Sequence, residues 1–213
     1  MVRPLLGTDV SDYQGHIDWK QYAASGYSFS EIKATEGLYD SGTTFPYNWH
    51  QSRANGVIRI AYHFLRPEYD GARQADILHR RVRNSGHFIR NDGVMLDLEE
   101  MDNQSPYAVV KCAESFVERI LSTTECGVIL YCNYDFWVNQ LGNPRSTILG
   151  RCPLHQASWH SRPAPIDNWP SGPALQQYAA DGRVPGIQNQ VDLDWAFCDK
   201  RTLRALCRLG GRR

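Results

Sequence analysis

Short apolar runs alternate with longer amphipathic segments through the first two thirds of the sequence, and this alternation limits the choice of fold most strongly. Strand-like runs are expected at 27–34, from Val57, from Val94 and at 127–131. Helices are expected from Lys20 to Ser25, where Gly26 ends the helix, and at 45–55, 71–84 and 107–122. Strands that alternate with helices favour a parallel sheet surrounded by helices.

The regular alternation weakens beyond Asn143. Prolines punctuate a loop-rich region there, at positions 144, 153, 163, 165, 170 and 173. Proline lacks a backbone N–H group, so this region has little room for complete strand–helix repeats. We therefore expect an α/β fold, an irregular (β/α) barrel of the TIM type whose helices are missing or short in the last third.

The stretch Met95-Leu96-Asp97-Leu98-Glu99 places two carboxylates two residues apart at the end of an apolar run. If Val94, Leu96 and Leu98 are the buried positions of a strand, Asp97 and Glu99 project from its other face, about 7 Å apart. Two carboxyl groups this close in a cleft do not both ionise easily. One of them tends to keep its proton at neutral pH and is then available as a general acid.

Three other apolar runs carry polar groups at their ends. The run at 5–10 ends near Asp9, the run at 57–64 ends near Tyr62 and His63, and the run at 190–194 carries Asp192 and Asp194. In a barrel of parallel strands the carboxyl ends meet at one rim, where active sites are built. A helix cap or a turn is the alternative for any single acid, and we expect His63 to be a hydrogen-bonded core residue.

Charge and cysteine content exclude several kinds of partner and site. Lys plus Arg equal Asp plus Glu at 23 each, so no overall field draws the chain to nucleic acid or anionic lipid. The apolar runs are too short to cross a membrane. The six cysteines contain no C-x-x-C pair, so we expect buried thiols and no metal site, with Cys198 and Cys207 as the first pair to check for a disulfide.

Five blocks follow one another in a fixed order: Gly7-Thr8-Asp9-Val10-Ser11 with Gln14-Gly15 and Ile17-Asp18-Trp19; Ile32-Lys33-Ala34-Thr35-Glu36-Gly37; Ala61-Tyr62-His63-Phe64; Leu96-Asp97-Leu98-Glu99; and Gln177-Tyr178 with Val191-Asp192-Leu193-Asp194. Together they span positions 7 to about 197, and the chain resembles glycoside hydrolase family 25, the Chalaropsis-type lysozymes. Two segments depart from the family pattern. Leu154-His155-Gln156-Ala157-Ser158-Trp159 stands where the family usually shows Leu-Trp-x-Ala-x-Tyr, and Tyr131-Cys132-Asn133 stands where it often has Tyr-Ser or Tyr-Thr before Asn.

The resemblance implies a muramidase that hydrolyses the β-1,4 bond between N-acetylmuramic acid and N-acetylglucosamine in peptidoglycan, with no cofactor or metal. Glu99 is the expected general acid. Asp97 either attacks the sugar carbon or, as we prefer, orients the substrate N-acetyl group while that group attacks, with net retention. Asp9 and Asp192 complete an acidic floor. Substrate contacts are expected at Tyr62, Tyr131, Gln177, Trp159, Lys33 and Glu36, although Lys33 and Glu36 could instead form a structural ion pair and Trp159 could simply pack at the rim.

Two other classes of function remain in view. Asp9, Asp97, Glu99 and Asp192 could bind Mg²⁺ or Mn²⁺ in a metal-dependent hydrolase. The chain could also be an inactive module that only binds cell walls.

The sequence also supports expectations about organisation and location. We expect one catalytic domain over 1–213, a monomer, and no separate wall-binding domain. The sequence shows no signal peptide before Asp9, which suggests a phage endolysin made in the host cytoplasm and dependent on a separate holin; a secreted enzyme that has been trimmed is the alternative. Several arginines near the end form either a solvated helix face or a basic tail that favours an anionic cell wall: Arg201, Arg204, Arg208, Arg212 and Arg213.

Overall fold

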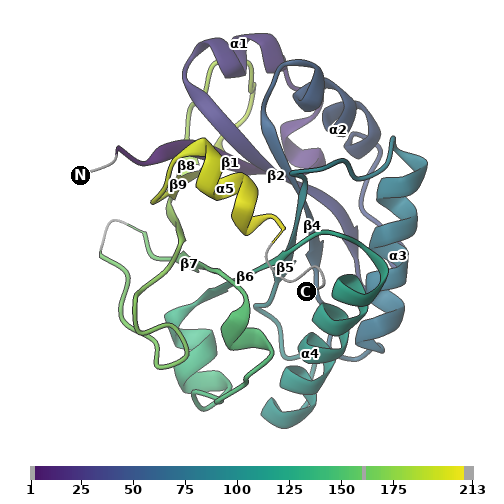
Figure 1. Cartoon of the computed structure of the whole chain (residues 1–213), viewed down its shortest axis with the longest axis vertical. Helices are drawn as coiled ribbons and strands as arrows, with labels where there is room; N and C mark the ends of the chain where they lie inside the picture. The colour runs from purple at the N-terminus through teal and green to yellow at the C-terminus, as the bar shows by residue number, and fades with distance from the viewer. Residues whose placement is uncertain (1–2, 160–161, 209–213) are drawn as a thin grey trace.

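The computed structural model describes residues 3–159 and 162–208, and they form an α/β barrel (Figure 1). Eight strands close in the order β1, β2, β4, β5, β6, β7, β8 and β9, because β9 returns to pair with β1. A two-residue strand, β3, pairs with the end of β2. The strands are β1 (Leu5–Val10), β2 (Tyr27–Glu36), β3 (Tyr39–Asp40), β4 (Ile58–Phe64), β5 (Gly93–Asp97), β6 (Val128–Asn133), β7 (Leu154–Ala157), β8 (Leu175–Gly182) and β9 (Val191–Ala196).

The barrel strands are parallel from β1 through β8, and β9 runs antiparallel to both of its neighbours. The helices are α1 (Trp19–Ala24), α2 (Phe45–Ala54), α3 (Gly71–Asn84), α4 (Pro106–Thr123) and α5 (Lys200–Leu206). Shorter helical turns lie at Asp12–Gln14, Phe136–Gln140 and Leu149–Arg151. The expected irregular barrel is thus confirmed, and its last third carries only short helical turns until α5.

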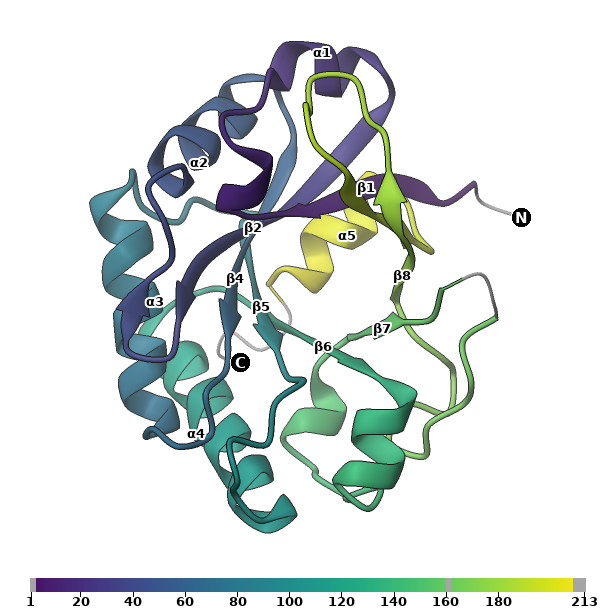
Figure 2. The same cartoon turned by 180° about the vertical axis from the view of Figure 1, so that it is seen from behind.

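Helices α3 and α4 lie side by side on one flank of the barrel (Figures 1 and 2). Helix α4 begins where the Ser105 hydroxyl accepts a hydrogen bond from the Ala108 N–H and Pro106 occupies the first turn. Its buried side chains recur at helical spacing, through Val109, Ala113, Phe116, Val117 and Ile120. This spacing is the reason that the sequence pattern located the helix within one residue at each end.

The two-residue period of the strands sorts side chains between the helix-covered outside and the barrel interior. On β4, Ile58, Ile60 and Tyr62 point inward, whereas Ala61 packs with the outer core. The interior is apolar at the end where the parallel strands begin. Helix α5 closes that end with Leu203 and Cys207, in front of the barrel in Figure 1 and behind it in Figure 2. The polar inward positions lie toward the other end.

Two glycines allow the interior to pack this tightly. A Cβ on Gly7 would lie 2.2 Å from the Phe29 ring, and a Cβ on Gly93 would lie 2.8 Å from the Cys207 sulfur. Any side chain at either position would therefore overlap with neighbouring atoms. Close contact of β1 with β2, and of α5 with β5, depends on these two residues.

The cysteine expectations are confirmed in their main part. Five thiols are buried, Cys198 is partly exposed, and all six are free, so the structure does not contain the disulfide considered for Cys198 and Cys207. Arg201, Arg204 and Arg208 are exposed at α5, which agrees with the solvated helix face, whereas Arg212 and Arg213 lie outside the described residues. Within the described part of the chain, no helix is both long and apolar enough to cross a bilayer.

His63 is a core residue, as expected from the sequence. Its ring is fully buried, bonds through Nδ1 to the Thr35 hydroxyl at 2.7 Å and through Nε2 to the Gln74 side-chain oxygen at 2.8 Å, and stacks on Phe116. Burial lowers the pKa of His63 from 6.5 to about 4. The folded protein therefore holds this imidazole neutral where an unfolded chain would protonate it.

This shift predicts a pH-dependent loss of stability that His63→Gln should remove. Because the folded-state pKa lies below the unfolded value, the contribution is complete above pH 6.5 and falls as the pH decreases from 6.5 to about 4. We expect the free energy of unfolding of the wild type to lose about 3 kcal/mol relative to the variant across this window. Urea unfolding of both proteins at matched pH values measures the difference, and parallel pH curves would contradict it.

Candidate active site

The acids predicted from the sequence gather toward the carboxyl ends of the parallel strands. Asp9 lies near the end of β1 and Asp97 ends β5. Asp192 pairs with Asp9 across the antiparallel ladder between β1 and β9. Because β9 runs in reverse, Asp192 reaches this rim near the beginning of its strand. The expectation that the acids of the rim lie at the carboxyl ends of parallel strands was therefore wrong for Asp192, although the residue does lie at the rim.

Asp97 and Glu99 flank Leu98, which is completely buried. Strand β5 ends at Asp97, but the backbone stays in register beyond it, since the Leu98 N–H donates to the Tyr131 carbonyl at 3.0 Å and the Leu65 N–H donates to the Asp97 carbonyl at 2.9 Å. Asp97 is buried at 6% exposure, whereas Glu99 is half-buried. One carboxyl is therefore enclosed and the other reaches solvent.

Both carboxyl groups are held toward their protonated forms. Burial, followed by repulsion from Glu99, raises the pKa of Asp97 well above its usual value, while the positive charge of Lys33 opposes the shift. Partial burial, followed by the neighbouring Glu100 carboxylate, raises the pKa of Glu99, and Lys33 again opposes the shift. Such a pair retains a proton under conditions where isolated carboxyl groups would be ionised.

Asp9 and Asp192 form a second pair of neighbouring carboxyl groups. Loss of solvation and then repulsion from Asp192 raise the pKa of Asp9 well above its usual value. Burial raises the pKa of Asp192 to about 6, against a hydrogen bond from Asp9. A proton on one of the two carboxyl groups would relieve the repulsion between acids that lie in direct register on adjacent strands.

Gln177 on β8 connects the floor of the site to its surface. Its Nε2 donates to Asp9 Oδ2 at 2.6 Å. Its Oε1 accepts from the Tyr131 hydroxyl at 3.1 Å and from Trp159 Nε1 at 2.9 Å. The Trp159 side chain is 54% exposed. The sequence had proposed these residues separately, and the structure joins them in one network.

Tyr62 and Lys33 face the same interior from β4 and β2. Burial, followed by repulsion from Asp9 and Asp97, raises the pKa of Tyr62 well above 10, so its phenol is neutral. Lys33 Nζ lies 2.9 Å from Glu36 Oε2. Glu36 also accepts two hydrogen bonds from Arg66, at 3.0 and 2.6 Å. The structural ion pair considered for Lys33 and Glu36 is thus present.

Three buried residues deeper in the barrel were not selected from the sequence as site residues. His155 on β7 lies between Glu31 on β2 and Asp194 on β9, and each of the three side chains has 0% exposure. The sequence did contain a signal for these residues, since each is a titratable residue within a strand that is otherwise largely apolar. Glu31 interrupts the apolar run at 27–34, and His155 was noted only as a departure from a family pattern.

Among residues 3–159 and 162–208, Glu31, His155 and Asp194 form a group of three potential metal ligands whose ligand atoms all lie within 4.8 Å of one another. Within the same described residues, the four acids at the rim do not form such a group.

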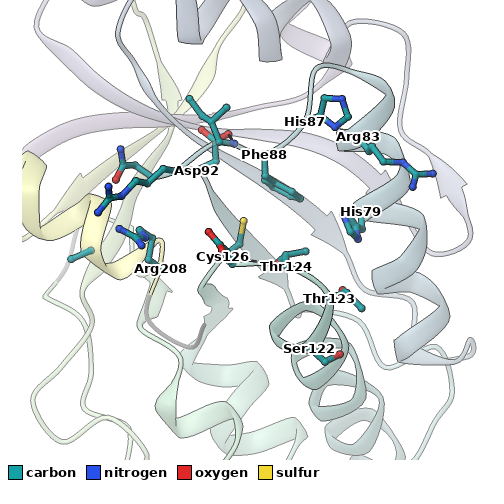
Figure 3. Close-up of a pocket in the computed structure, with 15 residues that line it drawn as sticks. His79, Arg83, His87, Phe88, Asp92, Ser122, Thr123, Thr124, Cys126 and Arg208 are labelled. Atoms are coloured by element: carbon teal, nitrogen blue, oxygen red, sulfur yellow. Dashed lines mark hydrogen bonds between the residues drawn. The ribbon is translucent and has the colours of Figure 1, made fainter. Parts of the chain in front are cut away.

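A cavity of about 770 Å³ lies at the other end of the barrel, beside α3, α4 and α5 (Figure 3). Asp92 and Cys126 line it, and these residues precede β5 and β6. The Asp92 carboxylate bonds to Arg59 through both oxygens, at 2.9 and 2.8 Å. The cavity therefore does not contain the acids of the rim, and its one buried carboxylate is already paired.

Comparison with known proteins agrees with the geometry. The family model for glycosyl hydrolases family 25 matches residues 8–187. Lysozyme M1 of Streptomyces globisporus is 30% identical over 197 residues, which cover 87% of this chain and 65% of that protein. The N,O-diacetylmuramidase of Arthroderma benhamiae is 31% identical over 175 residues, covering 77% of this chain and 72% of that protein.

Among solved structures, the bacterial lysozyme from Streptomyces coelicolor superposes with a TM-score of 0.86 at 29% identity, covering 98% of this chain and 99% of the other. The family model alone covers most of the chain, and its match includes Asp9, Asp97 and Glu99. The chain belongs to glycosyl hydrolases family 25.

Proposed function

We propose that the protein is an N-acetylmuramidase that cleaves the β-1,4 bond between N-acetylmuramic acid and N-acetylglucosamine in bacterial peptidoglycan. The observation that carries the proposal is the pair of carboxyl groups at the end of β5, one buried and one open to solvent, both held toward protonation. Glycoside hydrolysis needs one carboxyl group that donates a proton and a second that acts while ionised. Family membership and the names of the relatives support this substrate.

Glu99 is the proposed general acid. It has the longer side chain, reaches solvent and has a raised pKa, so it can carry a proton to the glycosidic oxygen as the bond breaks. The departing sugar then leaves as a neutral alcohol. The same carboxylate can afterwards accept a proton from the water that completes hydrolysis.

Asp97 is the proposed partner of the substrate N-acetyl group. Its Oδ1 atom is buried and has no hydrogen-bond partner among the described residues. The N–H of a bound N-acetyl group would supply the missing donor, and an ionised Asp97 would stabilise the positive charge that develops when the acetyl oxygen attacks the sugar carbon. This route gives net retention of configuration.

Asp9, Asp192 and Tyr62 form the polar floor beneath the reacting sugar. A proton on one of the two aspartates and the neutral phenol provide both donors and acceptors for sugar hydroxyl and acetyl groups. At the surface, Trp159 offers an exposed ring for stacking, oriented through Gln177 and Tyr131. Lys33 and Glu36 act at the edge, where Lys33 moderates the repulsion among the acids.

The proposal includes a monomeric enzyme that acts at the bacterial cell wall. If the chain is encoded by a phage, a separate holin would open the membrane for it.

Glu99→Gln tests the proposed acid. We expect this variant to fold normally and to lose about 10²- to 10⁴-fold in turnover, because an amide cannot donate a carboxyl proton. Asp97→Asn should also be severely impaired. Glu100→Gln is the matched control, because Glu100 is the adjacent exposed carboxylate, and it should retain most activity.

The measurement is digestion of purified peptidoglycan, borohydride reduction of the new ends, and mass analysis of the reduced sugars. Muramitol that depends on Glu99 supports the assigned bond and acid. Glucosaminitol would mean that the enzyme cuts the other linkage, and full activity of a folded Glu99→Gln protein would exclude Glu99 as the acid.

Trp159 provides a separate test of substrate binding at the rim. Trp159→Ala should raise KM roughly tenfold, equivalent to about 1.4 kcal/mol of binding, with a smaller effect on kcat. Trp159→Phe keeps an aromatic ring but removes the hydrogen bond to Gln177, so its KM should lie between those of the wild type and Trp159→Ala. Tyr107→Ala changes an exposed aromatic on α4 and serves as the control. An unchanged KM in Trp159→Ala would remove this residue from the binding site.

A further inference from the structure

A histidine bridges two carboxylates inside the barrel, below the acids of the rim. His155 Nδ1 lies 3.1 Å from Glu31 Oε1, and His155 Nε2 lies 3.2 Å from Asp194 Oδ1. The three side chains come from β7, β2 and β9 and have no exposed surface. Asp194 pairs with Gly7 on β1, whereas Asp192 pairs with Asp9, so the bridge lies two residues below the rim pair on the same ladder.

The two ring nitrogens of His155 each lie close to a carboxylate, and the contact between Nδ1 and Glu31 Oε1 is a hydrogen bond, whereas the contact between Nε2 and Asp194 Oδ1 is an ion-pair distance of 3.2 Å. A neutral imidazole has one N–H group, so it could donate to one carboxylate while its other nitrogen presented a lone pair to the second. An imidazolium donates to both. Among the described residues, Glu31 Oε2, both oxygens of Asp194 and His155 Nε2 are buried and have no hydrogen-bond partner. Two carboxylates buried in this way are costly unless a cation lies between them.

The positive charge extends its influence to the rim. Lost solvation raises the pKa values of Asp9, Asp97 and Asp192, and His155 lowers all three; at Asp9 the neighbouring Asp194 and Glu31 carboxylates act against His155. The edge of its ring also meets Tyr131, with centroids 5.2 Å apart. The titratable groups that face this interior are Glu31 and Lys33 on β2, Asp192 and Asp194 on β9, Asp9 on β1, Tyr62 on β4, Asp97 on β5, Tyr131 on β6 and Cys207 on α5.

We propose that Glu31 and Asp194 hold His155 as an imidazolium, and that His155 is a positioning residue whose charge favours the ionised form of Asp97, against the burial that favours protonation, and so sets the acidic limit of catalysis. The inference rests on the proposed function, because the ionised Asp97 is the group that orients the N-acetyl substituent. His155 touches no substrate, and it acts through the field that it exerts on the acids above it.

Two substitutions test the charge with opposite expected signs. His155→Gln removes the cation and leaves both anions, so the pKa of Asp97 should rise. The acidic limb of the profile of kcat/KM against pH should then move up by about one pH unit, and kcat/KM at a pH below this limb should fall about tenfold. Asp194→Asn removes one anion without changing the shape of the side chain, so the limb should move down. A purely structural role would lower activity equally at all pH values.

The second variant also identifies where the proton resides. If the bridging proton belongs to Asp194 and His155 is neutral, Asp194→Asn leaves the net charge of the group unchanged and the limb does not move. That result would overturn the proposal. His63→Gln is the matched control, because it changes a buried histidine on the outer face of the barrel, and its acidic limb should coincide with that of the wild type.

Nitrogen NMR of the wild type provides a measurement that needs no variant to fold. Both ring nitrogens of His155 should carry protons from pH 5 to pH 8, and a neutral tautomer in that range would overturn the inference. Elemental analysis of the same sample matters as well, since a stoichiometric metal that a chelator removes, with a change in the His155 ring signals, would show that a metal ion replaces the proton.

Failure of the proposed function would look different. If the wild type releases no muramidase product at any pH, the assigned reaction is wrong, and the NMR result still decides the charge of His155. If the wild type is active but the acidic limb stays fixed in both variants, the reaction stands and the role of His155 falls.

Discussion

The antiparallel ladder between β1 and β9 is the contact on which the barrel and its chemistry both depend. Without it, β1 would be an open edge of the sheet, with unpaired backbone groups. The reversed direction of β9 also determines which acids meet. It places Asp192 opposite Asp9 at the rim and Asp194 opposite Gly7 further inside. The same strand pairing therefore closes the barrel and brings the acids of its floor together.

The sequence predicted the elements that have a clear period. Helices α3 and α4 and strands β1, β4 and β5 follow apolar patterns that their buried faces require, and the spacing of Asp97 and Glu99 correctly indicated two carboxyls together at a rim. The direction of β9 could not be predicted, because alternation of side chains is the same in a parallel and an antiparallel strand. The position of Asp192 near the start of its strand follows from that direction alone.

The part of the site that sequence missed consists of polar residues on strands that otherwise look apolar. Taken alone, Glu31 and His155 look unfavourable in a strand, since an isolated buried charge destabilises a fold. Their role is clear only in the folded barrel, where β2, β7 and β9 bring Glu31, His155 and Asp194 together. Gln177 presents the same difficulty, because a motif can identify the residue but not the three partners that occupy its amide group. Long-range pairing in space, rather than local propensity, carries this information.

The Gln177 side chain links the exposed edge of the site to its buried floor. One planar amide joins an indole that is half open to solvent with a carboxyl group on the floor of the barrel. Because the amide is planar, any rotation of it changes the hydrogen bond to Trp159 and the hydrogen bond to Asp9 together. A sugar ring that displaced the indole would therefore also disturb the hydrogen bond between Gln177 and Asp9, and the fluorescence of Trp159 would report a change at an acid that it does not touch.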